Sequence, residues 1–170
     1  MLAMTAHSEN KWRVWKELSD ILGEAYYGDG IESTNLYCIL GDIESAMKKV
    51  EGKSERLRQL YEEVRAIIKD APDAHLFSER AWVASYIFYL NRNKFKAMRE
   101  QINRNTSKII SLADDIEFLY NEEDLAEDQE DAESIRKEIS NVSSKMCNLK
   151  RENNNIISEI KNFTIKFLAE

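Results

Sequence analysis

Apolar side chains recur at alternating intervals of three and four residues along most of this chain, which is the spacing of amphipathic helices. The pattern predicts four helices, at about 11–27, 34–70, 74–120 and 125–168. The last three carry heptad-patterned apolar seams, which keep one face of a helix against a partner helix. Glycine and proline number only 5 and 1, so few turns are encoded and the elements must be long. We therefore expect an all-α, elongated helical bundle that forms a single domain over residues 1–170.

Glycine and proline mark the expected helix ends. The turn sequence at 28–30 ends the short first helix, and Pro72 stops the second because proline lacks a backbone amide to donate. Gly41 and Gly52 weaken the second helix. The apolar phase continues across both glycines, so we expect both to lie inside that helix.

The last two long helices are expected to fold back on each other as an antiparallel coiled-coil hairpin. No glycine or proline separates them, so one continuous rod is the alternative. Two observations favour a turn. No whole number of heptads connects Leu119 with Ile135, and Asp124 and Glu127 have the reciprocal spacing of a capping box. The turn is therefore expected between residues 120 and 125.

This hairpin has an expected register, because an antiparallel pair must bring apolar seam residues face to face. The register that matches every seam position places Leu119 opposite Leu125. The same register places Asn91 opposite Asn153. Two facing amides can satisfy each other's hydrogen bonds, and a buried polar layer fixes the alignment of a coiled coil. Asn91 and Asn153 are therefore the expected structural register residues.

Composition and charge narrow the class of protein. The formal net charge is −7, which disfavours nucleic acid as a partner because phosphate binding needs lysine and arginine. The most apolar run, at 81–90, is too short to span a bilayer, and the N-terminus lacks the pattern of a signal peptide. Cys38 and Cys147 are expected to be free, buried thiols, with a disulfide between helices as the alternative. We expect a cytoplasmic protein without a membrane span.

The expected hairpin turn is strongly acidic. From residue 114 to 133, 11 of 20 residues are Asp or Glu and none is Lys or Arg. A solvated tip that keeps the protein soluble explains this composition, and so does a docking surface for a basic partner. The acids do not follow the order of an EF-hand loop. The candidate partner-binding residues here are Glu122, Glu123, Asp124 and Asp128.

Basic side chains gather elsewhere in two groups. One comprises Arg92, Lys94, Lys96, Arg99, Arg104 and Lys108, and the other Lys48, Lys49, Lys53, Arg56 and Arg58. Solvated helix faces with internal ion pairs explain both groups. A patch for phosphate or for an acidic partner is the alternative, and the charge separation could also support head-to-tail association of the acidic tip with the basic segment.

Two groups of aromatic residues are candidate contacts. Trp82, Tyr86 and Tyr89 form a stripe on a segment that is apolar nearly all round, which favours burial against the second helix. A partner or homodimer interface is the alternative, because Trp and Tyr are enriched in such places. Trp12 and Trp15 are expected to anchor the first helix on the bundle, with a detachable partner-binding helix as the alternative.

Catalytic chemistry finds little support in the sequence. The only histidines are His7 and His75, and neither a phosphate-binding glycine loop nor a nucleophile elbow is present. We expect no catalytic residue, metal ligand or cofactor. The sequence therefore predicts a non-enzymatic protein–protein interaction or assembly protein, with a homo-oligomer as one form. The alternative function is a small inhibitor or adaptor that docks its acidic tip, 114–133, onto a basic surface.

Overall fold

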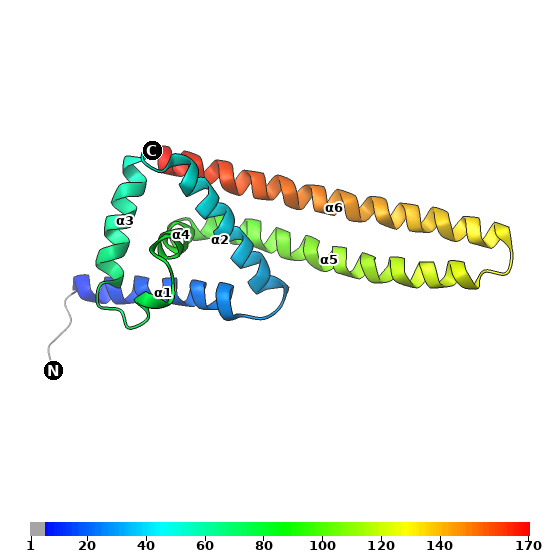
Figure 1. Ribbon diagram of the computed structural model, residues 1–170, viewed down its shortest axis with the longest axis horizontal. Helices are drawn as coiled ribbons and strands as arrows, with labels where there is room; N and C mark the ends of the chain where they lie inside the picture. Colours follow the sequence, from blue (N-terminus) through cyan, green and yellow to red (C-terminus); the bar gives the residue numbers. More distant parts are fainter. Residues whose placement is uncertain (1–5) are drawn as a thin grey trace. The chain divides into compact units, whose positions relative to one another are not determined.

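The computed structural model describes residues 6–170, with side chains from residue 10 onward. Within these residues the chain is helical and contains no strand, and its last two helices pack closely as a hairpin (Figure 1). This confirms the all-α bundle with an antiparallel hairpin. The helices are α1 (Ala6–Tyr27), α2 (Ile31–Val50), α3 (Glu55–Ile68), the short 3-10 helix η1 (Ala74–Leu76), α4 (Glu79–Leu90), α5 (Arg92–Leu125) and α6 (Gln129–Ala169).

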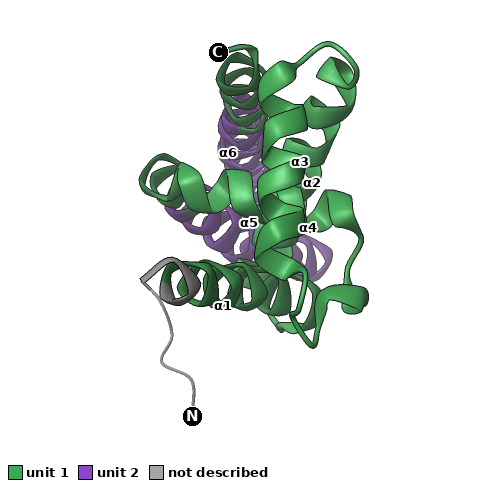
Figure 2. Ribbon diagram, turned by 90° about the vertical axis from the view of Figure 1, so that its left-hand side faces the viewer, with its two compact units in different colours: residues 1–99, 157–170 green, residues 100–156 purple. Residues whose placement is uncertain are grey.

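The chain divides into two compact units, coloured separately in Figure 2. Unit 1 comprises residues up to 99 together with 157–170, and unit 2 comprises residues 100–156. Unit 2 is the hairpin itself, formed by most of α5, the loop at 126–128 and the first two thirds of α6. That the two units form a single folding domain stays a prediction.

Helix α4 supplies the centre of the unit 1 core. Residues 81–85, 87 and 88 are buried and together cover every side of the helix, which packs against α1, α2 and α3. Trp82, Val83 and Ile87 have no exposed surface. A helix that is apolar all round must be covered all round, and this arrangement confirms the expected burial of that segment.

The expected second helix, 34–70, is broken, so this boundary is a correction. Helix α2 ends at Val50, and Gly52 has φ +78°, which no helix interior contains. Ser54 then caps α3, because its hydroxyl accepts a hydrogen bond from the amide of Leu57 at 3.0 Å. Gly41 does lie inside α2, as expected. A continuing apolar phase was therefore compatible with a turn at the second glycine.

The expected third helix, 74–120, is also broken. Ser78 caps the start of α4 through a hydrogen bond from the amide of Ala81, and α4 ends at Leu90 with Asn91 as its C-cap. The amide and the side-chain Nδ2 of Asn91 both donate to the carbonyl of Ile87, at 3.2 and 3.0 Å. Helix α5 begins at the next residue, Arg92. A local asparagine cap explains this break between the two helices, which the heptad count did not reveal.

The hairpin register differs from the expected one. Asn153 accepts a hydrogen bond of 3.0 Å from Nδ2 of Asn105, and not from Asn91. Near the tip, Arg136 pairs with Glu123 at 2.6 Å in the same alignment. The amide layer that we expected is therefore present, but its partner lies two heptads further along α5. The physical reason is that a shift by whole heptads preserves every seam position, so seam matching alone cannot distinguish the two alignments.

The cysteines are free, as expected, but they are exposed rather than buried. Cys38 directly precedes the buried Ile39 on α2, and Cys147 directly follows the seam residue Met146 on α6. Each thiol therefore lies one position away from the apolar face of its helix. A shift of one residue turns a side chain by about 100° around a helix, which is enough to bring it to the surface.

Candidate interaction surface

The acidic segment 114–133 covers the end of α5, the loop and the start of α6, all within unit 2. All of its acidic side chains are exposed except Glu123. The ion pair of Glu123 with Arg136 joins the two helices near the tip and raises the pKa of the arginine. Glu123 therefore has a structural partner, while Glu122 and Asp124 face solvent.

Asp128 begins the second helix of the hairpin. Its Oδ1 accepts a hydrogen bond of 2.8 Å from the amide of Asp131, which is the contact of an N-cap residue. The expected cap was Asp124 with Glu127, so the turn lies four residues later than the sequence analysis placed it. Asp128 thus stabilises the start of α6 and adds its charge near the positive end of the helix dipole.

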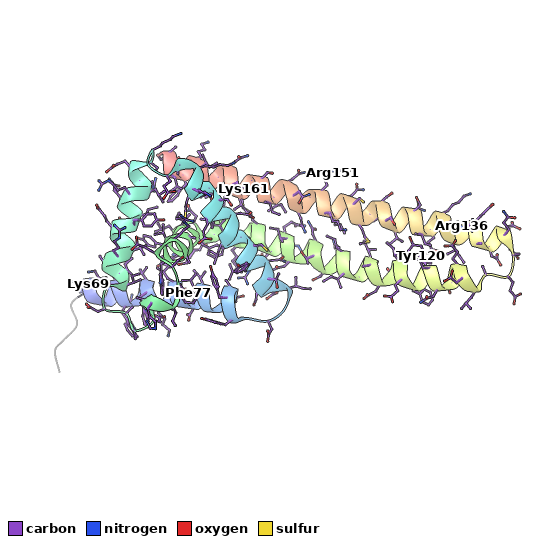
Figure 3. The ribbon with its side chains drawn as sticks, viewed as in Figure 1. Lys69, Phe77, Tyr120, Arg136, Arg151 and Lys161 are labelled. Atoms are coloured by element: carbon purple, nitrogen blue, oxygen red, sulfur yellow. The ribbon has the colours of Figure 1, made fainter. Side chains whose placement is uncertain are left out.

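Large apolar side chains lie exposed among these acids. Phe118 is 60% exposed, Leu125 is 80% exposed, Tyr120 is 53% exposed and Ile110 is 46% exposed. Figure 3 labels Tyr120 on α5 and Arg136 on α6. Leu125 was assigned to the seam by the sequence analysis, and the later turn moves it out. Large exposed apolar side chains that share one face of a folded protein commonly mark a binding surface.

The tip also carries a shallow hollow of about 530 Å³. Its apolar lining comes from Leu125, Ala126 and Ile135, and its acidic rim comes from Glu122, Glu127, Asp128 and Asp131. Among the described residues, no three His, Cys, Asp or Glu side chains converge closely enough to hold a metal ion. A hollow lined by both carboxylates and apolar side chains suits the charged head and aliphatic stem of a lysine or arginine side chain.

A second groove, of about 420 Å³, crosses the middle of the hairpin. It is lined by Lys108, Ser111, Leu112, Lys145, Asn148 and Leu149. Its floor is mostly apolar, because Leu112 and Leu149 belong to the two seams. The lysines on its rim give it the opposite charge to the tip, so unit 2 presents both signs of charge on different parts of its length.

The aromatic stripe is largely internal. Trp82 has no exposed surface, and its indole donates to the carbonyl of Ala74 at 3.0 Å. It is therefore not available to a partner in this structure. Tyr86 and Tyr89 stack with ring centroids 6.5 Å apart and are half-buried. Burial, together with the carboxylate of Glu63, raises the pKa of Tyr86 to about 12. A partner role for the two tyrosines stays a prediction.

Exposed aromatic rings gather instead at another place in unit 1, which the sequence analysis missed. Tyr26, Tyr27 and Tyr37 are exposed, and the Tyr26 and Tyr37 rings meet edge-on with centroids 5.2 Å apart. Phe77, labelled in Figure 3, lies against Tyr26 and Tyr27 at 5.3 and 6.0 Å. The sequence feature that could have indicated this cluster is the pair Tyr26–Tyr27 directly before a glycine turn. Neither tyrosine belongs to the apolar face of the first helix.

Of the two tryptophans expected to anchor the first helix, Trp15 makes the hydrogen bond that ties α1 to the rest of unit 1. The Trp15 indole donates to Oδ1 of Asp73 at 2.8 Å, and the Ser19 hydroxyl donates to Oδ2 of the same carboxylate at 2.8 Å. Trp12 lies against the Trp15 ring but is more than half exposed. The anchoring role therefore belongs to Trp15, through a hydrogen bond that apolar spacing did not indicate.

Several basic side chains have partners within the chain. Arg99 pairs with Glu24 across unit 1, and Arg58 pairs with two glutamates of its own helix. Such pairs support the interpretation of the basic groups as helix faces with internal ion pairs. His75 is exposed. His7 lies outside the residues whose side chains are described.

Within residues 6–170, no helix combines the length and the apolar character that crossing a membrane requires.

Comparisons with known proteins add no relative to these observations. No protein-family model matches this chain, and comparisons with curated proteins and with solved structures also found no match.

Proposed function

We propose that this chain is a protein–protein interaction protein whose hairpin tip docks onto a basic surface of its partner. One observation carries the proposal. Phe118 and Leu125 are largely exposed within a segment that holds 11 acidic residues, and no Lys or Arg occurs between residues 109 and 135. In this proposal, the interaction role and the acidic-tip role that the sequence suggested separately use one surface.

A tip that serves solubility alone accounts for the acids but not for the apolar side chains between them. Exposing a leucine or phenylalanine side chain forgoes about 1.5–3 kcal/mol of burial free energy. An interface uses both features, because apolar residues supply affinity and the surrounding charges select the partner and raise the association rate. The hollow beside Leu125 adds a place where a basic side chain can insert.

Charge reversal at the tip tests this function. We would replace Glu122, Asp124 and Glu127 with lysine, since all three are exposed. Glu123 and Asp128 stay unchanged, because reversing them would break an ion pair and a helix cap.

A control variant carries the same change in charge on exposed acids of unit 1, through Glu17→Lys, Asp20→Lys and Glu159→Lys. The whole chain is cross-linked in cells of its source and purified. We expect the wild type and the control to retain the same partner, and the tip variant to lose it. In a parallel purification without cross-linking, retention of the partner should fall as salt rises. A partner that the tip variant retains as well as the control would refute the proposed function.

A further inference from the structure

Three of the four large exposed apolar residues of α5, namely Ile110, Phe118 and Leu125, form a stripe on one face of the helix. Ile110 and Phe118 are separated by eight residues, and Phe118 and Leu125 by seven. At about 100° per residue, the three side chains fall within a sector of about 80°. The seam residue Leu119, which is buried, lies on the opposite side. The stripe is about 22 Å long at 1.5 Å per residue.

Acidic residues border this stripe on both sides. Glu117 and Asp124 follow one edge, and Asp115 and Glu122 follow the other, by the same helical spacing. Asp114 lies within the stripe, between Ile110 and Phe118. All of these carboxylates are exposed. The stripe also ends at the C-terminus of α5, where the helix dipole adds partial negative charge.

We propose that the occupant of this face is a basic amphipathic helix, which packs along the outer side of α5 as a third helix on the hairpin. The inference rests on the proposed function, and it names the chemistry and the conformation of the partner. A helix places apolar residues on one face every three to four residues, so it can contact all three stripe residues along four turns. Lysine and arginine beside its apolar face would meet both acidic borders.

Other occupants fit the face less well. A disordered basic tail would satisfy the carboxylates but would leave the apolar residues in water. A second copy of this chain that used the same face would bring two acidic borders together, which like-charge repulsion opposes. The combination of an apolar stripe with one sign of charge on both sides therefore favours a helix of opposite charge.

Two synthetic peptides and two variants test the proposal on the full-length protein. One peptide of about 18 residues carries leucine at heptad seam positions and lysine elsewhere, so its leucines share one face. The other has the same composition in an order that spreads the leucines round the helix. The variants are the double substitution Phe118→Ser with Leu125→Ser, and Tyr120→Ser, which removes an equally exposed ring outside the stripe.

We expect the wild type to bind the first peptide about ten-fold or more tightly than the second, measured by fluorescence anisotropy. The double variant should lose this preference and bind both peptides equally, while Tyr120→Ser keeps it. The bound first peptide should gain helical circular dichroism. Because the substituted side chains are exposed, the circular dichroism of the protein itself should not change.

The opposing outcomes separate this inference from the proposed function. Equal binding of both peptides to the wild type, reduced by tip charge reversal, would overturn the third helix and leave the acidic docking surface standing. Binding of neither peptide would count against both. If the double variant instead lowered the mass of the protein in sedimentation, the occupant would be a second copy of this chain, and the proposal would be wrong.

Discussion

The amide layer of the hairpin gives the sharpest prediction, because it decides between two registers. Asn105 is 1% exposed. Its Nδ2 donates to Asn153 at 3.0 Å and to Glu152 at 3.2 Å, and its Oδ1 accepts from Gln101 at 2.9 Å. We would replace Asn105 and Asn153 with alanine, singly and together. The pair of Asn91 with Asn153, treated in the same way, represents the alternative alignment.

The expected energies follow from these contacts. Asn105→Ala removes three hydrogen bonds and leaves the amide of Gln101 without its acceptor, so it should cost about 1–3 kcal/mol of unfolding free energy. Asn153→Ala removes one of these bonds, while Asn105 keeps Glu152, so it should cost about 1 kcal/mol. In the double variant their shared bond is lost only once, which gives a coupling energy of about 1 kcal/mol.

Urea unfolding followed by far-ultraviolet circular dichroism measures these energies. The three tryptophans lie in unit 1, so fluorescence recorded in parallel reports that unit separately. Asn91 donates to the carbonyl of Ile87, so its substitution should combine additively with Asn153→Ala, within about 0.5 kcal/mol. Coupling of Asn153 to Asn91, with none to Asn105, would refute the observed register and the reasoning from it.

Three further predictions concern unit 1 and the thiols. Gly52→Ala should destabilise the protein by about 1–2 kcal/mol, since φ is +78° there. Gly41→Ala lies inside α2 with open space around the new Cβ and should stabilise the protein by about 0.5–1 kcal/mol; urea unfolding measures both changes. Spectrophotometric titration should show a tyrosine that ionises near pH 12, and this ionisation should be lost in Tyr86→Phe. Because the folded pKa of Tyr86 is raised above 10.0, the neutral side chain stabilises the folded state fully below pH 10. This stabilisation is lost as the pH rises toward 12. Cys38 and Cys147 should both react with a thiol reagent in the folded protein without prior unfolding, and protection of either one would contradict its exposure.

The sequence predicted what periodicity controls and missed what single hydrogen bonds control. Helical class, the hairpin and the burial of the segment around Trp82 follow from the spacing of apolar residues, which averages over many positions. The breaks at Gly52 and Asn91 depend on one positive φ and one side-chain cap. Neither the positive φ nor the side-chain cap changes the spacing of the apolar residues around it. The same holds for Trp15, whose polar partner Asp73 lies 58 residues away.

The candidate surface was predicted in part for a similar reason. The acidic residues of the tip are close together in the sequence, so local composition alone was enough to predict an acidic tip. The exposure of Phe118 and Leu125 was not predicted. Helix α5 carries apolar residues on two faces, and the sequence alone does not show which face packs against α6. The tyrosines at 26, 27 and 37 were missed likewise, since their contact joins α1 to α2 across a turn.

The register of the hairpin decides whether Leu125 is available to the proposed docking surface. In the alignment that pairs Asn91 with Asn153, Leu125 would lie against Leu119 inside the hairpin, and the tip would keep only its charge. The observed alignment pairs Asn105 with Asn153 and leaves Leu125 at the surface, 80% exposed. That exposure forgoes about 2 kcal/mol of burial, which the remaining seam contacts must outweigh. If a mutant cycle showed coupling of Asn153 to Asn91, Leu125 would lie inside the hairpin, and the proposed third helix would lose its contact with Leu125.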